Sequence, residues 1–130
     1  MSKYLLPLPL VLVAGCASIN NYSSSYVVQN ITKADIKLIA NDFVHNLKKP
    51  LPPAKTTLIV TKSHTEDNFT PVFINLLRRN GYTVIYTDQP KQQNGVILTY
   101  RITRIEIGIL SFVSYDLDGA THYYIRTYNR

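Results

Sequence analysis

The side chains that could perform catalysis or hold a metal are few in this sequence of 130 residues: eight carboxylates, three histidines and one cysteine. Asp116 and Asp118 point to one side of a predicted strand and could chelate a cation, but the glycine that follows favours a turn. His64 with Glu66, or with His122, would form a metal site only if the fold joined distant segments. The sequence has no nucleophile elbow, phosphate-binding glycine loop or metal-ligand cluster, and so predicts no enzyme, catalytic residue, metal, cofactor or small-molecule substrate.

Cys16 carries the clearest chemical signal. Lys3 is followed by ten uncharged residues at 4–13, a core typical of a signal peptide and too short to span a bilayer as a helix. The leader ends in a sequence that resembles the lipobox of bacterial lipoproteins: Val13, Ala14, Gly15 and then Cys16. We therefore expect residues 1–15 to be a lipoprotein signal peptide and the Cys16 sulfur to carry the lipid. The alternatives are an ordinary cleaved leader or a buried segment with an incidental thiol.

The residue after this cysteine bears on the compartment. In lipoproteins of Gram-negative bacteria, an aspartate at that position tends to retain the protein at the inner membrane. Here the position is occupied by Ala17. The resemblance thus implies a lipid-anchored protein of the outer membrane that faces the periplasm. Several acyl chains on one residue hold far more firmly than a single chain, because each buried methylene contributes about 0.8 kcal/mol.

The positive charge is too dispersed for a nucleic-acid site. The formal net charge is +6, and the only adjacent basic pairs are Lys48/Lys49 and Arg78/Arg79. No block of basic residues is present to follow a phosphate backbone. We predict no nucleic-acid partner, and we interpret the excess as a solvated surface near anionic lipid or an acidic partner.

Residues 16–31 are rich in serine and asparagine after the cysteine, which predicts a flexible tether. An alternative is that Tyr26, Val27 and Val28 add as a strand to the sheet edge of a partner. The single domain that must position any binding surface is then expected over residues 32–130.

Two amphipathic helices are predicted in this domain. The first begins at Thr32, with Asp35 in its first turn, and ends before Pro50. The second is capped by Asp67 or Asn68 and ends at the Asn80-Gly81 pair. The predicted inner face of the first helix comprises Ile36, Ile39, Phe43 and Leu47. That of the second comprises Phe69, Val72, Phe73, Leu76 and Leu77.

Five segments read as strands because they are rich in β-branched and aromatic residues: 55–62, 82–87, 96–107, 109–117 and 120–128. The Asp118-Gly119 pair between the last two favours a type I′ hairpin turn. The order helix, strand, helix and four strands predicts an α+β fold, with two helices packed on one face of a small, mostly antiparallel sheet.

Arginines and tyrosines gather in the last strands, and these residue types are favoured at interface hot spots. They suggest a protein-contact surface made of Arg101, Arg104, Arg126, Tyr100, Tyr124 and Tyr128. The alternative is ordinary cross-strand pairing on a solvated face.

Several short motifs, taken in their order along the chain, resemble the TrbH family, small lipoproteins encoded with conjugative type IV secretion systems. They are Asp42-Phe43, Pro52-Pro53-Ala54-Lys55-Thr56, Asp67-Asn68-Phe69, Leu76-Leu77-Arg78, Gly81-Tyr82 and Leu98-Thr99-Tyr100-Arg101. The resemblance implies a structural or assembly component of the channel's outer-membrane portion, without enzymatic activity and with other channel proteins as partners. It also implies a fold similar to the small α+β domains of secretins.

Two rival functions are compatible with the same residues. One is an outer-membrane biogenesis or lipid-handling lipoprotein, in which the sheet face would bind lipid or a barrel protein. The other is a surface-exclusion lipoprotein that blocks redundant mating.

Overall fold

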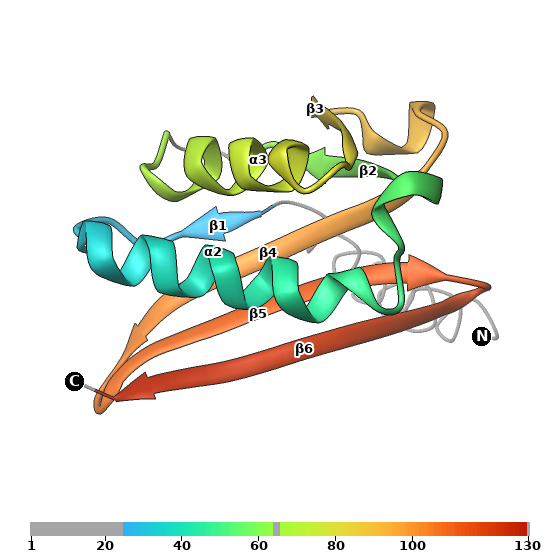
Figure 1. Ribbon diagram of the computed structural model, residues 1–130. Coiled ribbons are helices and arrows are strands. Elements are labelled where there is room, and N and C mark those ends of the chain that lie inside the picture. Colours follow the sequence, from blue (N-terminus) through green and yellow to red (C-terminus); the bar gives the residue numbers. More distant parts are fainter. Residues whose placement is uncertain (1–24, 64–65, 130) are drawn as a thin grey trace, which may run out of the picture.

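The computed structural model describes residues 25–63 and 66–129, which form the elements of Figure 1. The two helices are α2 (Lys33–Lys48) and α3 (Phe69–Arg79). The strands are β1 (Tyr26–Val27), β2 (Thr57–Thr61), β3 (Thr83–Thr87), β4 (Val96–Ile105), β5 (Gly108–Leu117) and β6 (Ala120–Asn129). Short 3-10 turns lie at Pro53–Lys55 and Pro90–Gln92. Neither helix of the described residues is long and apolar enough to cross a membrane.

Helix α2 forms as the sequence predicts. The Thr32 hydroxyl accepts a hydrogen bond from the Asp35 amide at 3.1 Å, which satisfies an otherwise unpaired donor of the first turn. The apolar residues of its inner face recur every three or four positions and are buried: Ile36, Ile39, Ala40, Phe43, Val44 and Leu47.

Helix α3 begins at the expected place but presents a partly different face. The Asp67 carboxylate caps it by accepting the Thr70 amide at 2.6 Å, whereas Asn68 makes no side-chain cap bond. Val72 was expected inside, but its side chain is 38% exposed, and Ile74 is buried in its place. The stripe differs because α3 rests against both α2 and the sheet, which turns Thr70 and Ile74 inward.

The sheet is mixed and mostly antiparallel, in the order β3-β2-β4-β5-β6, with β1 paired to β4. The long ladders β4–β5 and β5–β6 are antiparallel, while β2 pairs with β3 and β4 in parallel. The parallel β2–β3 pair follows from the crossover through α3, since parallel neighbours need a long connection. Both helices cover one face of the sheet (Figure 1), which confirms the predicted α+β class.

Two tight turns shape the long strands. Asp118 and Gly119 have φ of 54° and 80°, the left-handed pair of a type I′ turn, as predicted. The strand expected over 96–107 ends at Ile105, and Gly108 then opens β5. A Cβ on Gly108 would lie 1.9 Å from the Tyr128 carbonyl oxygen, so only glycine fits this close approach to β6.

The start of the domain differs from the expected boundary at residue 32. β1 lies beside β4, with Tyr26 opposite Arg101, and Val27 is only 3% exposed. The Val28 amide donates to the Ile102 carbonyl at 2.9 Å. Residues 25–28 therefore belong to the sheet rather than to a tether, because their apolar side chains and backbone groups find partners in this chain. The strand pairs with its own sheet, not with the edge of a partner. The earlier part of the expected tether lies outside the described residues.

Candidate protein-contact surface

The pairing register shows which face of the sheet carries each of the six arginines and tyrosines predicted to form one contact surface. Residues directly opposite across β4, β5 and β6 share a face, and Tyr100 and Tyr124 both oppose Val113. By the same register Arg104 lies in a row with Tyr128, on the face that carries the helices, although Arg104 itself is exposed. Arg101 lies in the row of Phe112 and Ile125, on the face that the helices leave open. Five of the six residues therefore share the helix-covered face and Arg101 lies on the other, and their role as a contact surface stays a prediction.

Tyr100 is a core residue. Its side chain is 0% exposed, and its ring centroid lies 5.4 Å from those of Phe69 and Phe73. Its hydroxyl bonds to the Thr70 hydroxyl, which itself donates to the Asp67 carboxylate at 2.9 Å. Burial raises the pKa of the Tyr100 hydroxyl far above its ordinary value. This tyrosine thus ties β4 to α3 and is inaccessible to a partner.

Arg101 and Arg104 each engage the start of the domain. The Arg101 guanidinium lies 5.0 Å from the ring centroid of Tyr26, a cation–π contact on the open face. The Arg104 guanidinium donates to the Asn30 carbonyl, in the connection between β1 and α2. Both side chains therefore help to hold residues 26–30 against β4.

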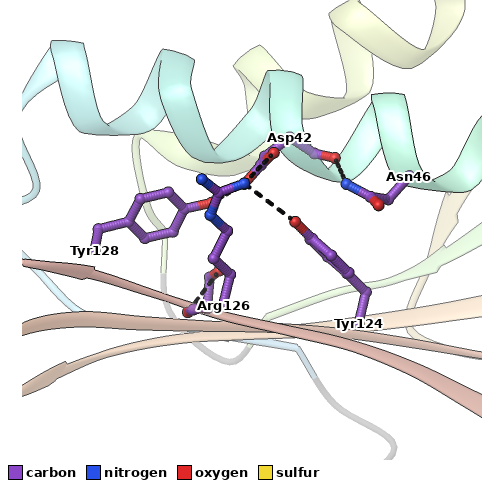
Figure 2. Close-up of polar contacts among 6 residues, drawn as sticks. Asp42, Asn46, Tyr124, Arg126 and Tyr128 are labelled. Carbon is purple, nitrogen blue, oxygen red and sulfur yellow. Dashed lines mark hydrogen bonds and ion pairs between the residues drawn. The ribbon is translucent and has the colours of Figure 1, made fainter.

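The other three predicted residues do gather, around a carboxylate of α2 (Figure 2). Asp42 Oδ2 lies 3.0 Å from Arg126 Nη1 and also accepts the hydroxyl proton of Tyr128. Arg126 Nη1 further donates to the Tyr124 hydroxyl at 3.5 Å. We call Asp42, Tyr124, Arg126 and Tyr128 the α2–β6 cluster.

Burial differs within the α2–β6 cluster, and so does the role of each member. The side chain of Asp42 is 15% exposed and that of Arg126 is 52% exposed. Burial, reinforced by the hydrogen bond to Asp42, raises the pKa of the Tyr128 hydroxyl well above its ordinary value. Asp42 and Tyr128 thus fasten the helix to the strand, while Arg126 and Tyr124 remain open to a partner. The ion pair itself contributes little to stability because its cation is solvated.

Asp42 was not among the residues predicted for the contact surface. Its sequence signal is weak, because a carboxylate in the middle of an amphipathic helix reads as a solvated polar residue. Its position became informative only when β6 was placed beneath α2, with Tyr128 and Arg126 on the covered face.

The other candidate chemical residues of the sequence are found apart from this cluster. Within residues 25–63 and 66–129, no three His, Cys, Asp or Glu side chains are grouped so that they could hold a metal. Asp116 accepts a hydrogen bond from Thr121 at 2.6 Å, and Asp118 lies in the hairpin turn, as the turn interpretation predicts. His122 stacks on Tyr115, with ring centroids 5.2 Å apart. His64 lies outside the described residues.

Two hollows lie beside α3. A cavity of about 230 Å³ lies beside its N-terminus, against residues 27–31. A groove of about 540 Å³ runs along the helix beside β3 and is lined by Asp67, Arg78 and Tyr86 among others.

The lipid-attachment sequence, Val13, Ala14, Gly15 and Cys16, lies outside the described residues, so it stays a prediction from the sequence. A comparison with protein families finds that residues 18–130 match the model of the family described as conjugal transfer protein TrbH. No curated protein and no solved structure matches the chain. The expected likeness to the small domains of secretins therefore also stays a prediction.

Proposed function

Since the chain belongs to the TrbH family of conjugal transfer proteins, we propose that it is a structural or assembly component of a conjugative type IV secretion system. The family match, which extends over almost all of the chain after the leader, is the observation that carries this proposal. TrbH is a conjugal transfer family rather than an enzyme family.

The proposal includes a lipid anchor. Cys16 would carry the lipid, residues 17–24 would form the tether, and the domain would face the periplasm from the outer membrane. The support is the order of a short apolar core, two small residues and a cysteine, followed by Ala17. Eight tether residues span at most about 28 Å, at about 3.5 Å each, so the domain would stay close to the bilayer.

Metabolic labelling with a palmitate analogue tests the anchor. We expect the wild-type chain to incorporate label and to sediment with outer membranes, and Cys16→Ala to do neither. Equal labelling of the two chains would refute lipidation at Cys16.

The partners in this proposal are other proteins of the secretion channel, met through side chains such as the exposed Arg126 and the partly buried Tyr124. Mild crosslinking in donor cells followed by purification should recover channel subunits, and deletion of the gene should lower the frequency of conjugative transfer. Recovery of a barrel-assembly or lipid-export protein, with transfer unchanged, would instead favour outer-membrane biogenesis. A gene whose loss alters only the ability of a cell to act as a recipient would favour surface exclusion.

The proposal also includes a fold similar to the small α+β domains of secretins. It is supported by the layer order of the described residues, in which two helices lie on one face of a small sheet. Such a sheet, covered by helices on one face, leaves its other face open to neighbouring subunits.

A further inference from the structure

Strand β6 forms one edge of the sheet over ten residues, the whole length of the hairpin. It is the last strand in the sheet order and the outermost strand in Figure 1. Its pairing with β5 runs from Ala120 to Asn129 without a bulge. Among the described residues, the sheet places no strand on its other side. A long row of backbone donors and acceptors is therefore available for another strand.

The opposite edge of the sheet is protected, and β6 is not. Strand β3 has only five residues, and Arg78 Nη2 donates to its Val84 carbonyl at 3.1 Å, which occupies an outward acceptor. Natural edge strands are usually blunted by shortness, proline, bulges or charged side chains such as lysine. Residues 120–129 contain no proline, glycine, lysine, aspartate or glutamate. The β6 edge therefore lacks most of the features that usually prevent a second strand from pairing.

Side chains of β6 on the open face support pairing as well. Tyr123 is 62% exposed and Ile125 is 58% exposed, and both lie on the face that carries no helix. Aromatic and β-branched residues form the most favourable cross-strand pairs. Two exposed residues of these types, with Thr121 and Thr127 on the same face, would gain from a neighbouring strand of similar composition.

The charge of β6 favours a second copy of the chain as the occupant. Arg126 is the only charged residue of β6, and Asp42 of the same chain already lies 3.0 Å from it. The strand thus carries no uncompensated charge to recognise an oppositely charged segment, and none to repel its own copy. From these observations we infer that β6 pairs antiparallel with β6 of a second copy of this chain.

Such a dimer has a defined geometry. In an antiparallel pair, residues directly opposite point to the same face, so the open face of one copy continues the open face of the other. The two six-stranded sheets become one continuous sheet, with all helices on one side. The contact is isologous, because each copy uses the same strand, and it therefore closes as a dimer. This inference rests on the fold alone and not on the proposed function.

Co-precipitation of two differently tagged full-length chains, expressed together and extracted in mild detergent, tests the dimer. We expect the wild-type copies to co-precipitate and Ile125→Lys to reduce the signal to that of an untagged control, because a lysine places like charges at the seam. Ile107→Lys is the matched control, since Ile107 is 59% exposed but lies in the turn between β4 and β5. Its co-precipitation should equal that of the wild type.

A photo-crosslinking amino acid in place of Tyr123 identifies the neighbour independently of the pairing register. We expect a product of twice the chain mass that carries both tags, and no such product when the same group replaces Tyr86 on β3, which is 37% exposed. The inference is overturned if wild-type copies do not co-precipitate, if Ile125→Lys and Ile107→Lys behave alike, or if the Tyr123 position links only to a different protein. None of these outcomes depends on lipidation or on conjugative transfer.

Discussion

Tyr100 and Tyr124 show how strongly tertiary neighbours determine what a residue does. Both oppose Val113, on the same face of the sheet, and both were expected at a contact surface. Helix α3 covers Tyr100 completely and supplies Thr70 as its hydrogen-bond partner. Tyr124 lies on the edge strand, only partly covered, where its hydroxyl contacts the solvated Arg126. The same residue type is therefore structural in one place and available for binding in the other.

The first prediction concerns the Tyr100 hydroxyl. Thr70 donates its only hydroxyl proton to Asp67, so Tyr100 must be the donor in the bond between them. Tyr100→Phe removes this buried bond and should lower the free energy of unfolding by about 1–2 kcal/mol. Urea denaturation measures the loss, and Tyr123→Phe, at an exposed position, should leave stability unchanged. A Tyr100→Phe protein as stable as the wild type would show that this hydroxyl has no structural role.

At the scale of elements, the start of α3 shows which of two adjacent capping residues forms the cap bond. Asp67 and Asn68 are both good capping types. The structure uses Asp67, whose two carboxylate oxygens accept the amide and the hydroxyl of Thr70, while Asn68 is exposed and makes no cap bond. This choice also anchors α3 over Tyr100, because Thr70 belongs to both contacts.

The second prediction follows from that choice. Asp67→Ala removes the cap and leaves Thr70 groups without their acceptor, so it should destabilise the protein by about 1 kcal/mol or somewhat more. Asn68→Ala is the neighbouring control and should change stability by only a few tenths of a kcal/mol. Thermal or urea unfolding distinguishes the two variants. Equal losses would mean that the cap is shared, contrary to the contacts observed.

At the scale of the whole molecule, three tyrosine hydroxyls join segments that lie far apart in the chain. Tyr82 donates to the Leu51 carbonyl at 2.6 Å, Tyr100 bonds to Thr70, and Tyr128 donates to Asp42. Burial raises the pKa of all three hydroxyls, that of Tyr82 to about 12. Each bond needs the protonated phenol, so the tertiary structure as a whole is linked to the protonation of these tyrosines.

The third prediction is the resulting pH dependence. Below pH 10, the ordinary tyrosine pKa, folded and unfolded chains both hold these protons, and the contribution to stability is constant. Between pH 10 and about 12, Tyr82 loses its proton in the unfolded chain but keeps it in the folded chain. The free energy of unfolding therefore falls as pH rises. Urea denaturation between pH 8 and 11.5 should show this decline. It should be smaller in Tyr82→Phe, and identical pH slopes in the two proteins would contradict the assigned linkage.

The sequence alone was sufficient for the local features of the fold. Both helices, their caps, the hairpin turn and five of the strands follow from periodicity and from residues with strong backbone preferences, and these act within a few positions of the chain. It also indicated three of the four members of the α2–β6 cluster through the enrichment of Arg and Tyr. The lipid-attachment site at Cys16 is likewise a matter of local sequence, and it stays a prediction.

Only the tertiary structure decided which of these residues meet. Residues 25–28 read as a tether because two apolar residues are too short a strand signal, yet β4 offers them an unpaired edge beside the end of β2. Asp42 binds Tyr128 only because β6 lies beneath α2. Tyr100 is a core residue and not a contact residue because α3 covers it and supplies Thr70 as its partner. The physical reason is that the burial and the hydrogen-bond partners of a residue depend on strand order and on helix packing. These join residues up to 86 positions apart in the described part of the chain, and such distant contacts leave no periodic pattern in the sequence.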